Sequence, residues 1–262
     1  MNRAGVMAYL AALLLSACGA TGPQSAAHGP ETLSPQTDVA RRAAIRLQLA
    51  ATYLEAGQFS VALDEVNKAL ALDSSLPDAY HIRALAYMNL REPQLAEENF
   101  RRALAVKPAD GDLLSNYGWF LCGINRYQEA VAMLDKAIGS PSAGGVTKPM
   151  INLGLCHLRN GDVANAERAL LRAHYLDERN PVANTNLAAL YYKRGDAGTA
   201  RPFIMRVNQD PRFANAESLW LGARIAHRLD DRRLQDALTE QLRRSFPESR
   251  ELAAFERGAW DE

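Results

Sequence analysis

Histidine and cysteine are scarce in this 262-residue sequence, with five and three copies, and neither residue forms the spaced clusters that hold metal ions. The chain also lacks a His-x-x-x-His pair, a glycine-rich phosphate loop and a Gly-x-Ser-x-Gly turn. Lys plus Arg and Asp plus Glu both number 30, so no net charge attracts nucleic acid or an anionic membrane surface. We therefore expect that the chain is not an enzyme and that it binds no cofactor, metal ion, nucleic acid or small-molecule substrate.

A long hydrophobic run is missing as well. The apolar stretch at residues 6–15 is too short for a membrane span, which needs about 20 residues, and it predicts a secretory signal over residues 1–17. The motif "LSAC", which ends at Cys18, resembles the lipobox of bacterial lipoproteins, whose signal is cut before the cysteine and whose thiol is acylated. The alternative is an ordinary signal peptide with an incidental cysteine.

The residue after the cysteine bears on localisation. In bacterial lipoproteins an aspartate there tends to retain the protein in the inner membrane, and this chain has Gly19. The resemblance therefore implies the periplasmic face of the outer membrane of a Gram-negative bacterium. Residues 18–38, rich in Gly, Pro, Ser and Thr, are predicted to be the acylated cysteine and a flexible tether.

From residue 39 the sequence repeats at an offset of 34. The segments "LAATY", "RALAY", "YGWFL", "LGLCH", "LAALY" and "LGARI" recur, each with a small residue second. Those small residues are Ala50, Ala84, Gly118, Gly154, Ala188 and Gly222. A second small series follows twelve residues later and is broken by Leu234 in the sixth unit. Small residues at this spacing let two helices of a hairpin approach closely, and they resemble the tetratricopeptide repeat (TPR).

The resemblance implies an all-α superhelical solenoid of six TPR hairpins over residues 39–246. One step is 36 residues rather than 34, and the extra residues fall in the loop "GSPSAGGVTKP" at 139–149. The tail 247–262 predicts a capping helix, with Leu252, Phe255 and Trp260 covering the last apolar face.

Two cysteines occupy the first helices of consecutive units, Cys122 in the third and Cys156 in the fourth. Stacked units place these helices in contact, and the signal peptide directs both residues to an oxidising compartment, so we predict a disulfide. Two buried free thiols are the alternative. Cys122 with His157 as a nucleophile pair has little support, because no oxyanion arrangement is visible.

In TPR stacks the first helices line the concave face, where partners bind. Inward positions of the first three units carry an apolar stripe, and position 6 of three consecutive units carries asparagine. The candidate groove comprises Leu47, Leu54, Leu85, Met88, Asn116, Trp119, Asn152 and Asn186. An asparagine ladder suits an extended peptide backbone. The alternatives are local reasons for the asparagines, and core packing or contact with the tether or cap for the stripe.

Several motifs narrow the family. They are "AEENFRRAL" (96–104), "NYGWFLC" (116–122), the proline-bearing loop and "NLGLC" (152–156), together with the lipobox and six repeats. The chain is similar to the type IV pilus biogenesis and stability lipoproteins, the PilF/PilW family of pilotins. The resemblance implies a lipoprotein that binds pilus secretin subunits and promotes their outer-membrane localisation and multimerisation. A general periplasmic TPR adaptor that scaffolds peptidoglycan enzymes is the alternative.

Overall fold

The computed structural model describes residues 35–141 and 144–260, and the predicted signal, Cys18 and most of the tether lie outside them. Thirteen helices and no strands make up the described residues. The helices are α1 (Pro35–Glu55), α2 (Phe59–Leu72), α3 (Pro77–Asn89), α4 (Pro93–Val106), α5 (Gly111–Gly123), α6 (Tyr127–Ile138), α7 (Thr147–Arg159), α8 (Val163–Leu176), α9 (Pro181–Lys193), α10 (Ala197–Asn208), α11 (Ala216–Arg228), α12 (Arg232–Ser245) and α13 (Arg250–Glu256). None of them is long and apolar enough to cross a membrane.

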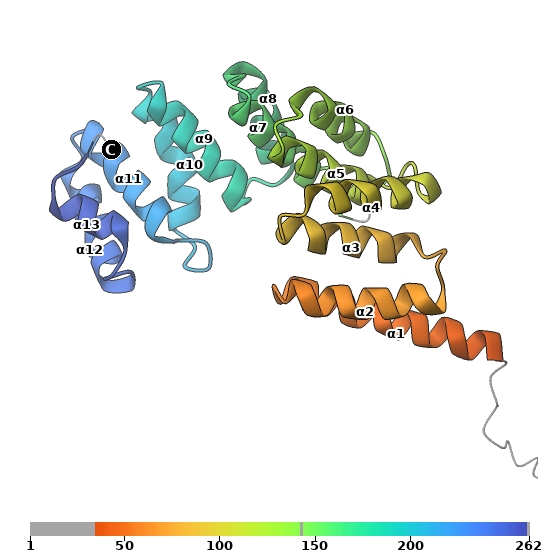
Figure 1. Ribbon diagram of the computed structural model, residues 1–262. Coiled ribbons are helices and arrows are strands. Elements are labelled where there is room, and N and C mark those ends of the chain that lie inside the picture. Colours follow the sequence, from red (N-terminus) through yellow and green to blue (C-terminus); the bar gives the residue numbers. More distant parts are fainter. Residues whose placement is uncertain (1–34, 142–143, 261–262) are drawn as a thin grey trace, which may run out of the picture.

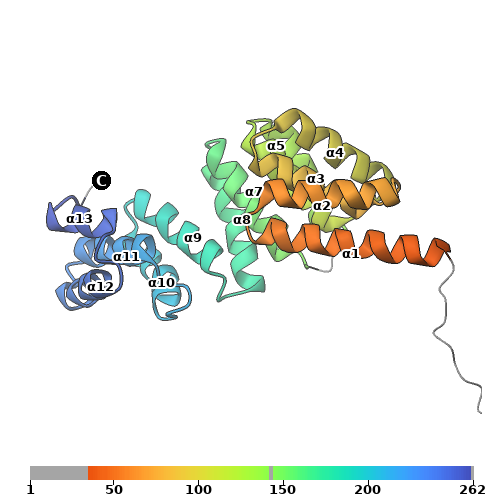
Figure 2. The same ribbon diagram turned by 60° about the horizontal axis from the view of Figure 1, so that its bottom comes forward.

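Helices α1 to α12 form six hairpins that follow one another along an arc, and α13 closes the C-terminal end (Figures 1 and 2). Each first helix contacts the first helix of the next unit, whereas no second helix among the described residues contacts another second helix. The first helices therefore lie on the inner side of the curve. The predicted all-α solenoid of six TPR hairpins is confirmed.

The small residues act where the repeat predicts. A Cβ on Gly118 of α5 would lie 2.7 Å from Leu134 Cγ and 3.1 Å from the Ala130 carbonyl oxygen of α6. A Cβ on Gly154 of α7 would lie 2.6 Å from Leu170 Cγ of α8. These separations are shorter than van der Waals contact, so glycine allows the two helices of each hairpin to approach this closely.

The N-terminal boundary differs from the prediction. Helix α1 begins at Pro35, so the last four residues of the predicted tether, 35–38, belong to a helix. Proline is well suited to the first helical turn, because the N–H that it lacks has no partner there in any case. The local composition, rich in Pro, Ser and Thr, is typical of a flexible tether, so the sequence did not indicate that a helix begins here.

The C-terminal cap is shorter than predicted. Helix α13 ends at Glu256, and Gly258, with φ of 70°, turns the chain back. Trp260 therefore reaches the last hairpin from the turn after the helix, where its ring lies 4.1 Å from the His227 ring and 5.1 Å from the Trp220 ring, centroid to centroid. Leu252 and Phe255 cover the same apolar face, as predicted.

Candidate protein-binding groove

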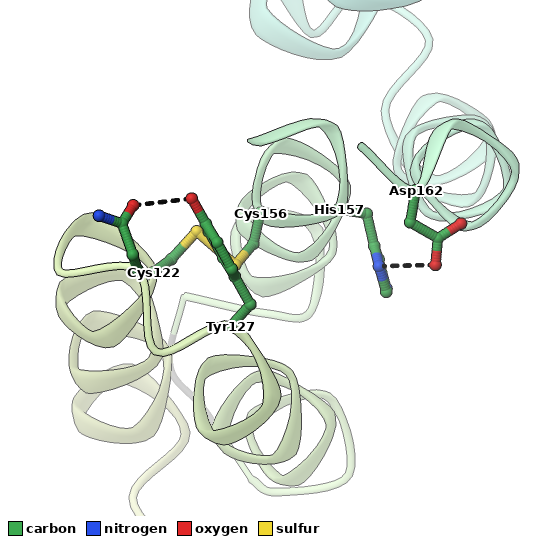
Figure 3. Close-up of a disulfide and its surroundings, with 6 residues drawn as sticks. Cys122, Tyr127, Cys156, His157 and Asp162 are labelled. Carbon is green, nitrogen blue, oxygen red and sulfur yellow. Dashed lines mark hydrogen bonds and ion pairs between the residues drawn. A yellow bond between two sulfur atoms is a disulfide. The ribbon is translucent and has the colours of Figure 1, made fainter. Parts of the chain in front are cut away.

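Helices α5 and α7 are joined at one point on the inner side of the solenoid. Cys122 and Cys156 form a disulfide pair with a Cα–Cα distance of 5.7 Å, and both side chains are buried. Tyr127, at the start of α6, lies beside the two sulfurs, and its hydroxyl donates to Asn125 Oδ1 at 2.7 Å (Figure 3). The structure thus meets the geometry predicted from the repeat positions, and oxidation of the pair in the cell stays a prediction.

The arrangement does not support a cysteine nucleophile. His157 points away from the sulfurs, and its Nδ1 lies 3.4 Å from Asp162 Oδ2 at the turn into α8 (Figure 3). Cys122 is paired with Cys156 instead of facing an imidazole. Within residues 35–141 and 144–260, no group of three or more His, Cys, Asp or Glu side chains is placed to hold a metal ion.

A hollow of about 330 Å³ lies next to the disulfide, where α3, α5 and α7 end. Its lining residues are Met88, Arg91, Pro93, Trp119, Phe120, Gly123, Ile124 and Arg159. The guanidinium of Arg159 lies over the Trp119 ring, with its Cζ atom 4.4 Å from the ring centroid. Two of the predicted groove residues, Met88 and Trp119, therefore meet in one hollow.

An ion-pair network holds the third unit against the second. Glu97 of α4 accepts from Arg126 Nη1 at 2.7 Å, from Arg101 Nη2 at 2.6 Å and from the Tyr117 hydroxyl at 3.2 Å. Burial of Glu97 acts to raise its pKa, but these donors outweigh burial and hold the pKa below its ordinary value. The Arg126 guanidinium also binds Glu129, so this residue of the turn before α6 is held to both α4 and α6.

The three predicted groove asparagines have different partners. Asn116 Nδ2 lies 2.9 Å from His81 Nε2, and Lys148 Nζ donates to Asn116 Oδ1 at 2.9 Å. Burial lowers the pKa of His81, so its neutral ring can accept this amide proton. Asn116 thus links the first helices of three consecutive units.

The other two asparagines are less suited to a ladder. Asn152 Nδ2 donates to Ser115 Oγ at 3.2 Å, and Asn186 Nδ2 donates to the Val182 carbonyl in its own helix at 2.8 Å. The bond within the helix gives Asn186 a local reason for its position. All three amides already have partners within the chain, so a bound peptide backbone would compete with these bonds.

The remaining groove candidates are half-buried. Leu85 and Met88 pack against the cluster that contains Phe100, and Leu47 packs against Ala50 and Val66 of the first unit. Leu54 is also half-buried, near the end of α1. Part of the stripe therefore belongs to the core, as the packing alternative requires, and the accessible part centres on Met88 and Trp119.

An apolar surface on the first unit was missed from the sequence. Ile45 and Leu49 of α1 are 51% and 38% exposed, and with Leu72 of α2 they line an open hollow of about 550 Å³. The residue equivalent to Ile45 in the second unit is Ala79, which is fully buried and packs with Val66 of α2. Among the described residues, no preceding unit supplies a second helix that could cover Ile45 in this way. The four-residue spacing of Ile45 and Leu49 was the signal available, because an exposed apolar pair at this spacing marks one helix face.

Three comparisons place these features among known proteins. Residues 83–144 match the tetratricopeptide repeat family. The chain is 32% identical over 256 residues to the type IV pilus assembly protein PilF of Pseudomonas aeruginosa, covering 98% of this chain and 99% of that one.

Two solved structures have the same fold. The crystal structure of PilW, described as a widely conserved type IV pilus biogenesis factor, superposes with a TM-score of 0.72 and 31% identity, covering 81% of this chain and 97% of PilW. The structure of Pseudomonas aeruginosa PilF superposes with a TM-score of 0.72 and 30% identity, covering 85% of this chain and 99% of that protein. Similarity at this level extends over the whole solenoid and beyond a single repeat.

Proposed function

The chain belongs to the PilF/PilW family of type IV pilus biogenesis proteins, and from this premise we propose that it is a pilotin. It is anchored to the periplasmic face of the outer membrane through an acylated Cys18. It binds pilus secretin subunits and promotes their localisation and multimerisation in that membrane. The observation that carries the proposal is the similarity to PilF along nearly the entire chain.

The mechanism is tethering. Acyl chains on Cys18 would hold the solenoid at the membrane, and capture of secretin subunits by the solenoid would raise their local concentration there. A scaffold of this type needs a rigid surface that presents apolar side chains to a partner. The solenoid has two such surfaces, the hollow around Trp119 and the hollow around Ile45.

Deletion of the gene tests the function. The expected result is that the secretin is made but stays monomeric on non-denaturing gels, and that surface pili are lost. Normal secretin multimers with intact piliation would refute the pilotin proposal, and the general adaptor would then be the better description.

Point variants decide which surface binds. Trp119→Glu and Ile45→Glu each place a charge in one hollow, and Val106→Glu places the same charge on α4 at a 58% exposed valine that lines neither hollow. If the predicted groove is correct, only Trp119→Glu should abolish secretin multimers in the complemented deletion strain. Loss with Ile45→Glu alone would move the binding surface to the first unit. Circular dichroism of the purified variants checks that each solenoid is folded.

A further inference from the structure

We propose that the hollow around Trp119 binds an extended peptide segment through a large apolar side chain that lies next to an Asp or Glu. The inference rests on the proposed function, since it specifies what a partner-binding solenoid would recognise. It is carried by one juxtaposition. Two exposed guanidiniums, of Arg91 and Arg159, border the same apolar hollow.

Neither guanidinium has an anionic partner among the residues that the structure describes. Within residues 35–141 and 144–260, no carboxylate lies within ion-pair distance of Arg91 or Arg159. Many other surface arginines are paired, as Arg126 is with Glu97 at 2.7 Å. Two arginines without a carboxylate partner beside one apolar hollow favour a ligand that carries both a carboxylate and an apolar group.

The geometry of Arg159 favours a carboxylate over other ligands. Its guanidinium lies over the face of the Trp119 ring, so the stacking fixes the plane of the group. A stacked guanidinium keeps its edge N–H groups free, and these donate to a carboxylate in a bidentate pair. The side chain is therefore oriented before the ligand arrives.

The floor of the hollow is suited to an apolar anchor. Met88, Trp119 and Ile124 line it, and Phe120 closes it from the core side. A Cβ added at Gly123 would meet no neighbouring atom within 4 Å, so this glycine leaves space at the end of α5. A volume of about 330 Å³ accommodates one Phe, Leu or Met side chain with part of its backbone.

The positions of the two arginines favour a side-chain carboxylate over a chain terminus. Arg91 lies in the turn after α3 and Arg159 at the end of α7, on the units before and after α5. A segment that crosses Trp119 along the inner side therefore passes both cations. This arrangement is suited to an internal stretch with an acidic residue beside the apolar anchor.

Peptide selection on the full chain, purified in detergent, tests the proposal. The probe is a library of random 12-residue peptides displayed at the amino terminus of a phage coat protein, so that no displayed peptide has a free carboxyl terminus. Wild-type protein is compared with Trp119→Ala, with the charge reversal Arg91→Glu/Arg159→Glu, and with Arg232→Glu/Arg233→Glu. The last variant makes the same charge change at exposed residues of α12, away from the hollow.

The expected enrichment on wild-type protein is an aromatic or large aliphatic residue within two positions of Asp or Glu. Trp119→Ala should lose the enrichment, the Arg91/Arg159 reversal should select Lys or Arg in place of the acid, and the α12 control should behave as wild type. Asp→Asn in an enriched peptide should weaken binding about 10-fold or more. The proposal is overturned if no peptide is enriched, if Trp119→Ala enriches the same peptides, or if the charge reversal leaves the acidic preference unchanged. The selection contains no secretin, so its failure and the failure of the pilotin function are separate results.

Discussion

Reduction of the Cys122–Cys156 pair is expected to lower the free energy of unfolding by about 4 kcal/mol. The two residues are 34 positions apart and both are buried, so the bond would close a long loop that contains α6, the loop before α7 and most of α7. In the chain-entropy model, a loop of this length removes about 13 cal/mol/K from the unfolded chain, or about 4 kcal/mol at 25 °C. For a chain of this size that corresponds to roughly 8 to 15 °C in Tm.

The assay is urea unfolding followed by circular dichroism, with and without reductant, in detergent. Cys122→Ala/Cys156→Ala is the control, since it removes the bond without a reductant and should agree with the reduced wild-type protein to within about 1 kcal/mol. Stability in a repeat protein is distributed among units and their interfaces, so hydrogen exchange should increase most in α5 and α7. Equal urea midpoints with and without reductant would refute the reasoning. The reasoning would also be refuted if the unfolded, non-reduced chain, with Cys18 acylated, contained one or more free thiols.

Three further outcomes are expected. The free energy of unfolding of Gly118→Ala, measured in urea, should be about 1–3 kcal/mol lower than that of Gly123→Ala. An added Cβ at residue 118 meets Leu134 at 2.7 Å, whereas one at residue 123 meets nothing within 4 Å. The pKa of Glu97 is lowered in the folded state, so the ionised Glu97 carboxylate stabilises the fold above the unfolded pKa near 4.3, and this stabilisation is lost as the pH falls. Glu97→Gln should therefore reduce the difference between the urea midpoints at pH 7 and pH 3.5. Cys18→Ser should move the chain out of the outer-membrane fraction on density-gradient separation, and its continued presence there would refute the lipid anchor.

Close packing explains how much of the fold the sequence reveals. A helical hairpin tolerates only small side chains at its crossing, so a small residue recurs once in each of the six units, at Ala50, Ala84, Gly118, Gly154, Ala188 and Gly222. The same periodicity places α5 beside α7, which explains why the sequence predicts that Cys122 and Cys156 lie within disulfide distance. Contacts between the first helices of consecutive units can thus be predicted from the repeat alone.

Features that depend on non-repeating contacts were not readable. The turn at Gly258 brings Trp260 onto His227 at the C-terminal end of the described residues, where α13 and this turn, and not a further hairpin, pack on the sixth unit. Exposure of Ile45 likewise arises because no unit precedes α1 in the described residues. Asn116 binds His81 and Lys148 of neighbouring helices, whereas Asn186 donates to the Val182 carbonyl of its own helix. A one-dimensional pattern does not specify which of these arrangements an asparagine adopts.

The disulfide and the hollow are coupled by helix geometry. Trp119 precedes Cys122 by three residues on α5, and Cys156 precedes Arg159 by three residues on α7, so each cysteine lies one turn from a residue of the stacked pair. A disulfide between the two cysteines would therefore fix the separation across which Arg159 covers Trp119. A bond that orders both groups in advance lowers the cost of binding.

We expect Cys122→Ala/Cys156→Ala to weaken secretin capture in a titration at a temperature where circular dichroism shows the variant fully folded. Capture of secretin with wild-type affinity by that variant would show that the hollow keeps its shape without the bond, or that secretin binds elsewhere.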